Sequence, residues 1–591
     1  MDVIPFQLYL TERQSKYIKL SKNVNMKSQL ENILSKSLNL LLILHNSDFG
    51  DFCLTPGQIK ESSQSADELA QKIELALRES GLVEKVQAEA GYVNIYLSKK
   101  AYLEELEKIR FAFRPQTATR LDQYLEIPDA KDKTIVFDYS SPNIAKPFSV
   151  GHLRSTVIGQ ANYNIHKALG YKTVGINHIG DWGTQFGKLI VAIKKWGNAQ
   201  EIEKNPIEEL TRLYQKFHEE AEKDETLEVN ARAWFKKLED GDSEARKLWG
   251  DCINWSYREF EKVYKILDVD IDEIKGESFY VDKQEAIIQE LKEKNLLKES
   301  EGAQIVELKG MPPALIKKSD GATLYMTRDL AALKYRLKSY RPAKIIYHVG
   351  NDQSLHFCQL EAVAEKLGWL KRSENPERSR GTQIVFAGHG MMRLSEGKMS
   401  TRAGRTVLLE DLIGEAKRRA LIIIEEKNPE LKNKEDVAEK IGISAIKYAD
   451  LATNRKSDIV FSYDKAITLQ GNSGPYLQYS YARTCALLRN FAGKFQSTKP
   501  VADLNKSAQK LARSIIKIKP AMDAAIKNNA PNTVCDFAYE LCNGLNSYYE
   551  KQRIVTFNKS ESSKNIYIVK IANSVLAKIF DLLGLAKLEK I

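Results

Sequence analysis

Cysteine and proline are scarce in this sequence. Only six cysteines occur among 591 residues, and even the closest pair, Cys535 and Cys542, lacks the Cys-x-x-Cys spacing of a structural zinc site. We therefore expect reduced, mostly buried thiols and no set of metal ligands. With 16 prolines, 43% hydrophobic residues and 28% charged residues, the composition is that of a globular protein and excludes wholesale disorder.

Long apolar runs are also missing. The best run, Leu38 to Leu44, is interrupted by Asn39 and is far shorter than the roughly 20 residues that span a bilayer. The N-terminal residues MDVIPFQLYL have neither the basic start nor the continuous apolar core of a signal peptide. These absences predict a cytoplasmic protein with no membrane partner.

Two common nucleotide-binding motifs do not occur. The sequence contains no Gly-x-x-x-x-Gly-Lys-Ser/Thr and no Gly-x-Gly-x-x-Gly that opens a helix after a strand. Their absence argues against a P-loop ATPase and against an ordinary dehydrogenase.

What the sequence has in excess is positive charge, and this charge lies at one end. The formal net charge is +11, and residues 465–591 alone contain 19 Lys and Arg against 8 Asp and Glu. Apolar residues recur there at helical spacing, with aromatic residues throughout. A basic helical bundle with a few exposed rings suits single-stranded RNA, because phosphates attract cations and bases stack on rings. A merely solvated basic face is the alternative.

The apolar pattern predicts three domains. Residues 1–115 are expected to form an α+β N-terminal domain, and residues 465–591 an all-α C-terminal bundle. Between them, over residues 116–464, short apolar strands alternate with helical patterns, which predicts an α/β fold with a doubly wound, Rossmann-like parallel sheet. A helical insertion over 195–270 interrupts this domain. The predicted strands of the sheet are 134–139, 171–177, 344–349 and 383–386.

The loop from Ser140 to His152, called the first loop below, follows the first of these strands. Ligands of such sheets bind at the carboxyl ends of the strands. Gly151 lets a ligand approach the start of the next helix, whose free N–H groups suit a phosphate. Lys146 and His152 add hydrogen-bond donors at the same place. On residue type alone, a histidine that opens a helix is also compatible with a structural role.

A second loop, Glu396 to Arg405, contains three cations and two hydroxyls, with glycines near both ends at Gly397 and Gly404. A basic loop with flexible ends suits a departing pyrophosphate, although a solvated surface loop has the same composition.

Together the two loops resemble the paired signatures of class I aminoacyl-tRNA synthetases: Val150-Gly-His152 in the first and Lys398-Met-Ser400 in the second. Three longer segments resemble arginyl-tRNA synthetases more specifically, and the resemblance covers nearly the whole chain. These segments are Ser141–Ser155, Asn177–Gly187 and Leu324–Leu330.

Two positions depart from the general signatures. Ser149 stands where the first signature has its first histidine, so a phosphate contact there needs a hydroxyl. Thr401 replaces the second lysine of the second signature, and Lys146 occupies the place of a lysine that is thought to compensate in arginyl enzymes. The letters His178-Ile-Gly-Asp181 imitate the signature but begin a different segment.

The resemblance implies an arginine–tRNA ligase that uses ATP, with Mg²⁺ bound to it, and L-arginine and tRNA as further substrates. It implies a catalytic role for Lys146, His152 and Lys398. The implied ATP-binding residues are Ser149, Gly151, His152, Lys398, Met399 and Ser400. The implied arginine-binding residues are Ser141, Asn143, His152, Glu277, Tyr325, Asp329 and Gln353.

A guanidinium is a planar cation with five donors and calls for carboxylates and carbonyl-type acceptors in a fixed plane. Asp329 is expected to be its main partner and Glu277 a second anion, for the ammonium group. Tyr325 and Asp329 stand four residues apart, which puts both on one face of a helix.

Two other functions stay open on the sequence. One is a class I synthetase for another amino acid, or a related nucleotidylyltransferase, since these share the first loop. The other is an inactive relative that only binds RNA. The family resemblance further implies a monomer.

Overall fold

The structure is a computed structural model that describes residues 25–38, 42–46, 50–113, 121–125, 130–318, 325–370, 381–395, 408–491 and 504–591. The second loop therefore lies outside the described residues. In the described part of the chain, no helix is both long enough and apolar enough to cross a membrane.

The N-terminal domain is an α+β unit, with a four-stranded antiparallel sheet in the order β1-β2-β4-β3. Helix α4 begins at a capping box, in which Ser65 and Glu68 bond each other's backbone N–H groups. The elements are α2 (Met26–Leu38), β1 (His45–Asn46), β2 (Phe52–Leu54), α3 (Pro56–Glu61), α4 (Ala66–Arg78), β3 (Val83–Glu89), β4 (Tyr92–Leu97) and α5 (Lys99–Ala112).

A five-stranded, all-parallel sheet forms the centre of the molecule, in the order β12-β11-β5-β6-β7. Chain order runs outward from β5 in both directions, so the sheet is doubly wound and its switch point lies between β5 and β11. The α/β prediction is thereby confirmed. The strands are β5 (Thr134–Asp138), β6 (Lys172–Asn177), β7 (Glu273–Ile274), β11 (Lys344–Tyr347) and β12 (Gln383–Phe386), and the connecting helices that cover them include α7 (Val150–Ala168), α14 (Tyr325–Tyr340) and α15 (Ser354–Lys366).

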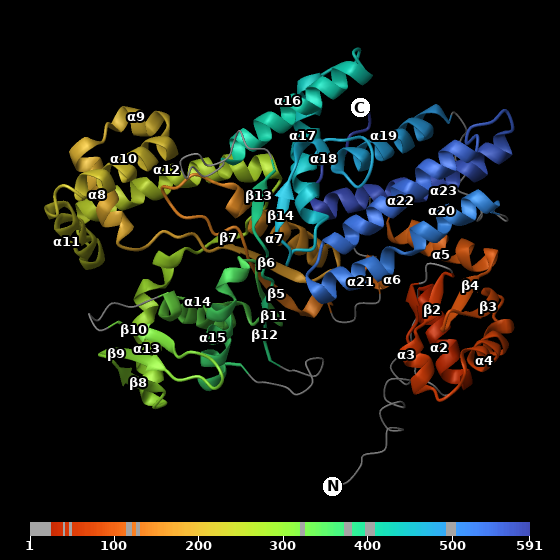
Figure 1. Ribbon diagram of the computed structural model, residues 1–591, viewed down its shortest axis with the longest axis horizontal. Coiled ribbons are helices and arrows are strands. Elements are labelled where there is room, and N and C mark those ends of the chain that lie inside the picture. Colours follow the sequence, from red (N-terminus) through yellow and green to blue (C-terminus); the bar gives the residue numbers. More distant parts are fainter. Residues whose placement is uncertain are drawn as a thin grey trace, which may run out of the picture.

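Two insertions extend from this sheet, and Figure 1 shows both at the side away from the C-terminal helices. The first is the helical insertion that the sequence predicts. It comprises α8 (Gln185–Trp196), α9 (Ala199–Lys204), α10 (Pro206–Ala221), α11 (Thr226–Asp240) and α12 (Ser243–Leu267). The second contains α13 (Gln284–Glu293) and a small antiparallel sheet of β8 (Leu297–Ser300), β9 (Ala303–Val306) and β10 (Ala314–Lys317).

Helices follow almost without interruption after Leu408. Helix α16 starts beside the first loop, and at its far end Asn428 Nδ2 donates to the carbonyl of Ile591 over 3.1 Å. These elements are α16 (Leu409–Lys427), α17 (Lys434–Leu451), α18 (Tyr463–Ala466), α19 (Gly474–Asn490), α20 (Lys506–Ile516), α21 (Ile518–Asn528), α22 (Asn532–Lys551) and α23 (Lys559–Leu583). Two short parallel strands, β13 (Met392–Leu394) and β14 (Ile459–Phe461), link this region to the sheet domain.

Polar contacts connect the sheet to the helices after Leu408, and the N-terminal domain to the C-terminal helices. Arg154 of α7 and Asp450 of α17 form an ion pair of 2.9 Å with both side chains at 1% exposure or less. Asp51 of the N-terminal domain accepts a hydrogen bond from Arg513 Nε of α20 over 2.9 Å. The N-terminal domain and the C-terminal helices accordingly lie side by side (Figure 1).

Candidate active site

The first loop leaves the carboxyl end of β5 and is held in an unusual backbone conformation. Ser140, Ser141 and Ala145 have φ of 73°, 50° and 59°, a left-handed region that residues other than glycine seldom adopt. The backbone N–H of Ser141 donates to Asn177 Oδ1 over 3.0 Å, and its hydroxyl donates to Asp138 Oδ1 over 3.1 Å. The loop is thus fixed by neighbours on β5 and β6.

Helix α7 begins at Ser149, which turns out to be its N-cap. The Ser149 N–H donates to Nδ1 of His152 over 3.2 Å, so Nδ1 is an acceptor and the ring proton belongs on Nε2. Burial, with a smaller contribution from the charge of Lys146, lowers the pKa of His152 to about 4. Near neutral pH the imidazole is therefore uncharged, and its Nε2–H remains available as a donor.

Lys146 and Gly151 are exposed, as is Asn143. Gly151 lies in the first turn of α7, where a Cβ would meet nothing closer than Ser149 Oγ at 3.4 Å. The first turn of the helix is therefore open to a ligand, with the Lys146 amine close enough to lower the pKa of His152.

The start of α16 is joined to the first loop by the backbone. Ser149 and Leu408 form an antiparallel bridge, and the Leu409 N–H donates to the Phe148 carbonyl over 3.2 Å. The first described residue after the second loop, Leu408, is thus fixed against the first loop. Lys398, Met399, Ser400 and Thr401 themselves lie outside the described residues.

The carboxylates of Asp329 and Glu277 lie beside the first loop, and this place is called the acidic site below. Asp329, the fifth residue of α14, accepts a hydrogen bond from His356 Nε2 over 2.5 Å, and His178 Nε2 lies 3.7 Å from its other oxygen. Burial favours the neutral acid, but the two histidines and Arg336 outweigh it and lower the pKa of Asp329. The carboxylate is therefore ionised, and its side chain remains 25% exposed.

Glu277 forms an ion pair with Arg328, 2.6 Å between Oε2 and Nη1. Among the described residues, Arg328 thus forms its ion pair with Glu277 and not with its neighbour in sequence, Asp329. Burial raises the pKa of Glu277 to about 7. The positive charge of Arg328 opposes this rise, and the negative charges of Asp329 and Asp181 add to it. Tyr325, 63% exposed, stacks under Arg328, whose guanidinium carbon is 4.7 Å from the ring centroid.

Gln353 is exposed in the turn after β11, across the switch point from the first loop. The described candidates for arginine binding therefore come from the carboxyl ends of β5 and β11, from η2 (Glu277–Lys283) after β7, and from α14. The structure brings them to one edge of the sheet.

Three site residues were missed from the sequence. His178 belongs to the segment dismissed as a false signature, yet this segment pairs with the first loop through the bridge between Asn143 and Gly180. His356 and Asp138 carry no motif of their own. Asp138, the last residue of β5, forms a buried ion pair of 2.7 Å with Arg336, and its position at a strand end was the one available signal.

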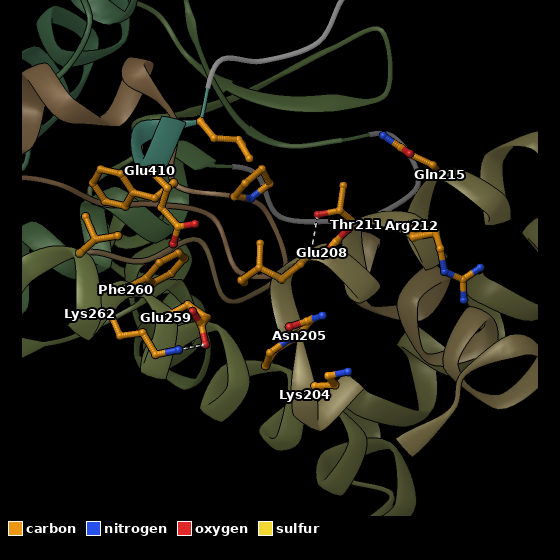
Figure 2. Close-up of a pocket in the computed structure, with 16 residues that line it drawn as sticks. Lys204, Asn205, Glu208, Thr211, Arg212, Gln215, Glu259, Phe260, Lys262 and Glu410 are labelled. Carbon is orange, nitrogen blue, oxygen red and sulfur yellow. Dashed lines mark hydrogen bonds and ion pairs between the residues drawn. The ribbon is translucent and has the colours of Figure 1, made fainter. Parts of the chain in front are cut away.

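A cavity of about 640 Å³ lies behind the first loop. Figure 2 shows Phe260 and Glu410 on one wall and Thr211 and Arg212 of α10 on the other. None of the candidate arginine-binding residues lines it, so it is separate from the acidic site. Within the described ranges, no group of three or more His, Cys, Asp or Glu side chains is placed to share a metal ion.

Comparison with known protein families matches three successive parts of the chain. The model for tRNA synthetases class I (R), catalytic domain, matches residues 117–463. The arginyl tRNA synthetase N terminal domain matches residues 23–97, and the DALR anticodon binding domain residues 477–591.

Curated relatives match over almost their whole length. An arginine–tRNA ligase of Clostridioides difficile strain 630 is 41% identical over 576 residues, 96% of this chain and 98% of the relative. One from Halothermothrix orenii is 40% identical over 590 residues, 96% of this chain and 100% of the relative. Among solved structures, the arginyl-tRNA synthetase from Plasmodium falciparum has a TM-score of 0.79 at 26% identity and covers 96% of this chain and 98% of its own.

Proposed function

Since the chain belongs to the arginyl-tRNA synthetase family of class I tRNA synthetases, we propose that the first loop and the acidic site beside it bind ATP and L-arginine next to each other. The chain is an aminoacyl-tRNA ligase. It activates arginine with ATP and transfers it to the 3′ end of tRNA, releasing pyrophosphate and AMP.

In the first step a carboxylate oxygen of arginine attacks the α-phosphorus of ATP, and the bond to pyrophosphate breaks. The carboxylate needs no deprotonation, so catalysis rests on positioning and on groups that stabilise phosphate charge. Lys146 and the Nε2–H of His152 hold the phosphates at the start of α7, together with the hydroxyl of Ser149 and the backbone N–H of Gly151. Lys398 binds the departing pyrophosphate, and Met399 and Ser400 contact ATP from the same loop.

Magnesium arrives with ATP as part of the substrate. Mg²⁺ commonly keeps waters and phosphate oxygens as ligands and needs few from the protein.

The observation that carries arginine selection is the carboxylate of Asp329, held ionised with one oxygen bonded to His356. Asp329 binds the guanidinium, with Tyr325 and Gln353 at its side. Glu277 meets the ammonium group, while Ser141 and Asn143 bind the amino acid near its carboxylate, beside His152. Lysine carries a compact point charge and cannot replace the two-pronged donor pattern of arginine in such a site.

The C-terminal helices bind the tRNA. Tyr479 and Tyr549 are 37% and 44% exposed, and the guanidinium carbon of Arg483 lies 4.7 Å from both ring centroids. Exposed rings around a cation offer an unpaired base a stacking surface and its phosphate a partner. This cluster, called the Tyr479 platform below, supports anticodon binding by these helices.

The test is aminoacylation with each of the twenty amino acids, together with ATP–pyrophosphate exchange. We expect arginine alone to be charged, and exchange to require tRNA. Charging of another amino acid, or none, would favour the two alternatives named from the sequence. Robust exchange without tRNA would contradict only the expected requirement for tRNA and not the charging of arginine.

We also propose that the protein works as a monomer in the cytoplasm. All six cysteines are free thiols, which suits a reducing compartment. Light scattering of the purified protein checks the monomer.

A further inference from the structure

One face of helix α12, in the helical insertion, holds the first loop. Ser256, Phe260 and Tyr264 follow one another at four-residue intervals and therefore share a face. Ser256 Oγ accepts a hydrogen bond from the Ala145 N–H over 2.9 Å. The rings of Phe260 and Tyr264 both pack edge-on against Phe148, with centroids 6.2 and 6.0 Å away.

The hydroxyl of Tyr264 is the central polar group of this face. It lies 2.8 Å from Ser140 Oγ and accepts a hydrogen bond from Asn177 Nδ2 over 2.9 Å. Asn177 in turn accepts the backbone N–H of Ser141 through Oδ1. One hydroxyl thus reaches Ser140 directly and Ser141 through a single intermediate.

Both residues need such support, because neither is a glycine and both have positive φ. A left-handed conformation of a residue with a Cβ persists only where the surroundings hold it. Tyr264, Ser140 and Asn177 are no more than 5% exposed, so water has little access to replace the hydroxyl. Burial raises the pKa of Tyr264, so that its hydroxyl keeps its proton.

We propose that Tyr264 is a positioning residue for arginine activation, which holds Ser140 and Ser141 in their left-handed conformation from the helical insertion. The rest of the first loop, including Lys146, takes its place from these two residues. The inference rests on the proposed role of the first loop in binding ATP and arginine. Tyr264 itself touches neither substrate.

The first experiment replaces Tyr264 with phenylalanine, which removes only the hydroxyl. We expect kcat for arginine-dependent ATP–pyrophosphate exchange, at saturating tRNA, to fall about tenfold, the equivalent of one neutral hydrogen bond. The KM for tRNA should stay within about twofold. Tyr257→Phe is the matched control, since it deletes the same group from the same helix, and should leave kcat unchanged.

Ser140 gives a second set of variants that separates positioning from general packing. Ser140→Ala and Ser140→Gly both lose the hydroxyl that meets Tyr264, but glycine adopts positive φ without steric cost. We expect Ser140→Ala to lose about tenfold in kcat and Ser140→Gly less than about threefold. In the Ser140→Gly background, Tyr264→Phe should lower kcat by a smaller factor than it does in the parent protein.

Equal losses for Ser140→Ala and Ser140→Gly would overturn the proposal, as would a full Tyr264→Phe effect in the Ser140→Gly background. An unchanged kcat in Tyr264→Phe would overturn it as well. Thermal unfolding of each variant reports its folding, and the two Ser140 variants decide the matter even where Tyr264→Phe is unstable. Failure of the parent protein to activate arginine would instead contradict the proposed function.

Discussion

Asp329 and His356 are joined by a hydrogen bond of 2.5 Å between Nε2 and Oδ2, which fixes the carboxylate on α14 from the neighbouring helix α15. The other oxygen lies 3.7 Å from His178 Nε2. In the proposed arginine site, the guanidinium would therefore meet an ionised carboxylate that His356 already orients.

Replacing Asp329 with asparagine tests whether this acceptor selects arginine. The variant keeps the shape of the side chain but loses its charge, so the charge-assisted hydrogen bond to guanidinium is lost. We expect the KM for arginine to rise about 100-fold, the upper end for a bond to a charged group. Steady-state exchange kinetics would show it, with the KM for ATP nearly unchanged.

Asp282→Asn provides the control, since Asp282 is an exposed carboxylate whose partner is Lys283. It should behave like the parent protein. A parallel loss of ATP and arginine binding in Asp329→Asn would show that the carboxylate is structural.

Glu277 should make arginine binding depend on pH. Its pKa of about 7 means that the carboxyl is mostly protonated at pH 6 and mostly ionised at pH 8. Only the ionised form attracts the ammonium group, so the apparent KM for arginine should be about tenfold higher at pH 6 than at pH 8. KM values measured from pH 5.5 to 8.5 test this. Glu277→Gln should have a raised KM that no longer changes over this range, and a flat profile for the parent protein would refute the role.

Lys146 should supply the cation that Thr401 does not. Lys146→Met is expected to lower kcat for activation about 100-fold, as expected for loss of a charged contact to phosphate in the transition state. Thr401→Lys added to that variant should restore at least about tenfold of the activity, because it returns a cation to the second loop. Single-turnover formation of arginyl-adenylate is the appropriate measurement. If Thr401→Lys restores no activity in the Lys146→Met variant, Lys146 does not compensate for the missing lysine at position 401.

The Tyr479 platform should contribute to tRNA affinity through stacking. Tyr479→Ala is expected to raise the KM for tRNA about tenfold, since stacking of one base on a ring contributes about 1–3 kcal/mol. Tyr479→Phe keeps the ring and loses only the hydroxyl that bonds Arg483, so it should stay near the parent value. Equal effects of the two changes would rule out stacking.

Salt separates the contribution of charge from that of stacking. Because the net excess of +11 lies in residues 465–591, tRNA affinity should fall steeply with salt concentration. Arg483→Ala should reduce the slope of log affinity against log salt, whereas Tyr479→Ala should lower affinity at every salt concentration and leave the slope unchanged. Filter binding with tRNA provides both slopes.

Most of the central sheet could be predicted from the sequence because its strands are buried on both faces. Such strands are continuous apolar, β-branched runs, and the predicted 134–139 and 344–349 correspond to β5 and β11. The edge strand β7 was missed, since two residues, Glu273 and Ile274, leave no pattern to detect. The small sheet of β8 to β10 was also missed, because its strands are four residues long and neither β8 nor β9 alternates between buried and exposed residues.

The place of the first loop, at the carboxyl end of β5, could be predicted because its residues are contiguous and directly follow an apolar strand. The second loop lies outside the described residues and stays a prediction. His178, His356 and Tyr264 could not be predicted, because each acts through a residue far away in the chain. The contact between His356 and Asp329 spans 27 residues, and that between Tyr264 and Ser140 spans 124. Only the packing of α12 and α15 around the sheet brings these pairs together.

Helix α16 begins at the bridge between Leu408 and Ser149 and ends near Asn428, which bonds the C-terminal Ile591. A cavity of about 700 Å³ at that far end is lined by Asn428, Tyr479 and Arg483. Nineteen residues of unbroken helix make a rod of roughly 28 Å. The first loop and the Tyr479 platform therefore lie at opposite ends of one stiff helix, and a tRNA that displaced the far end along the helix axis would also push on the backbone of Ser149.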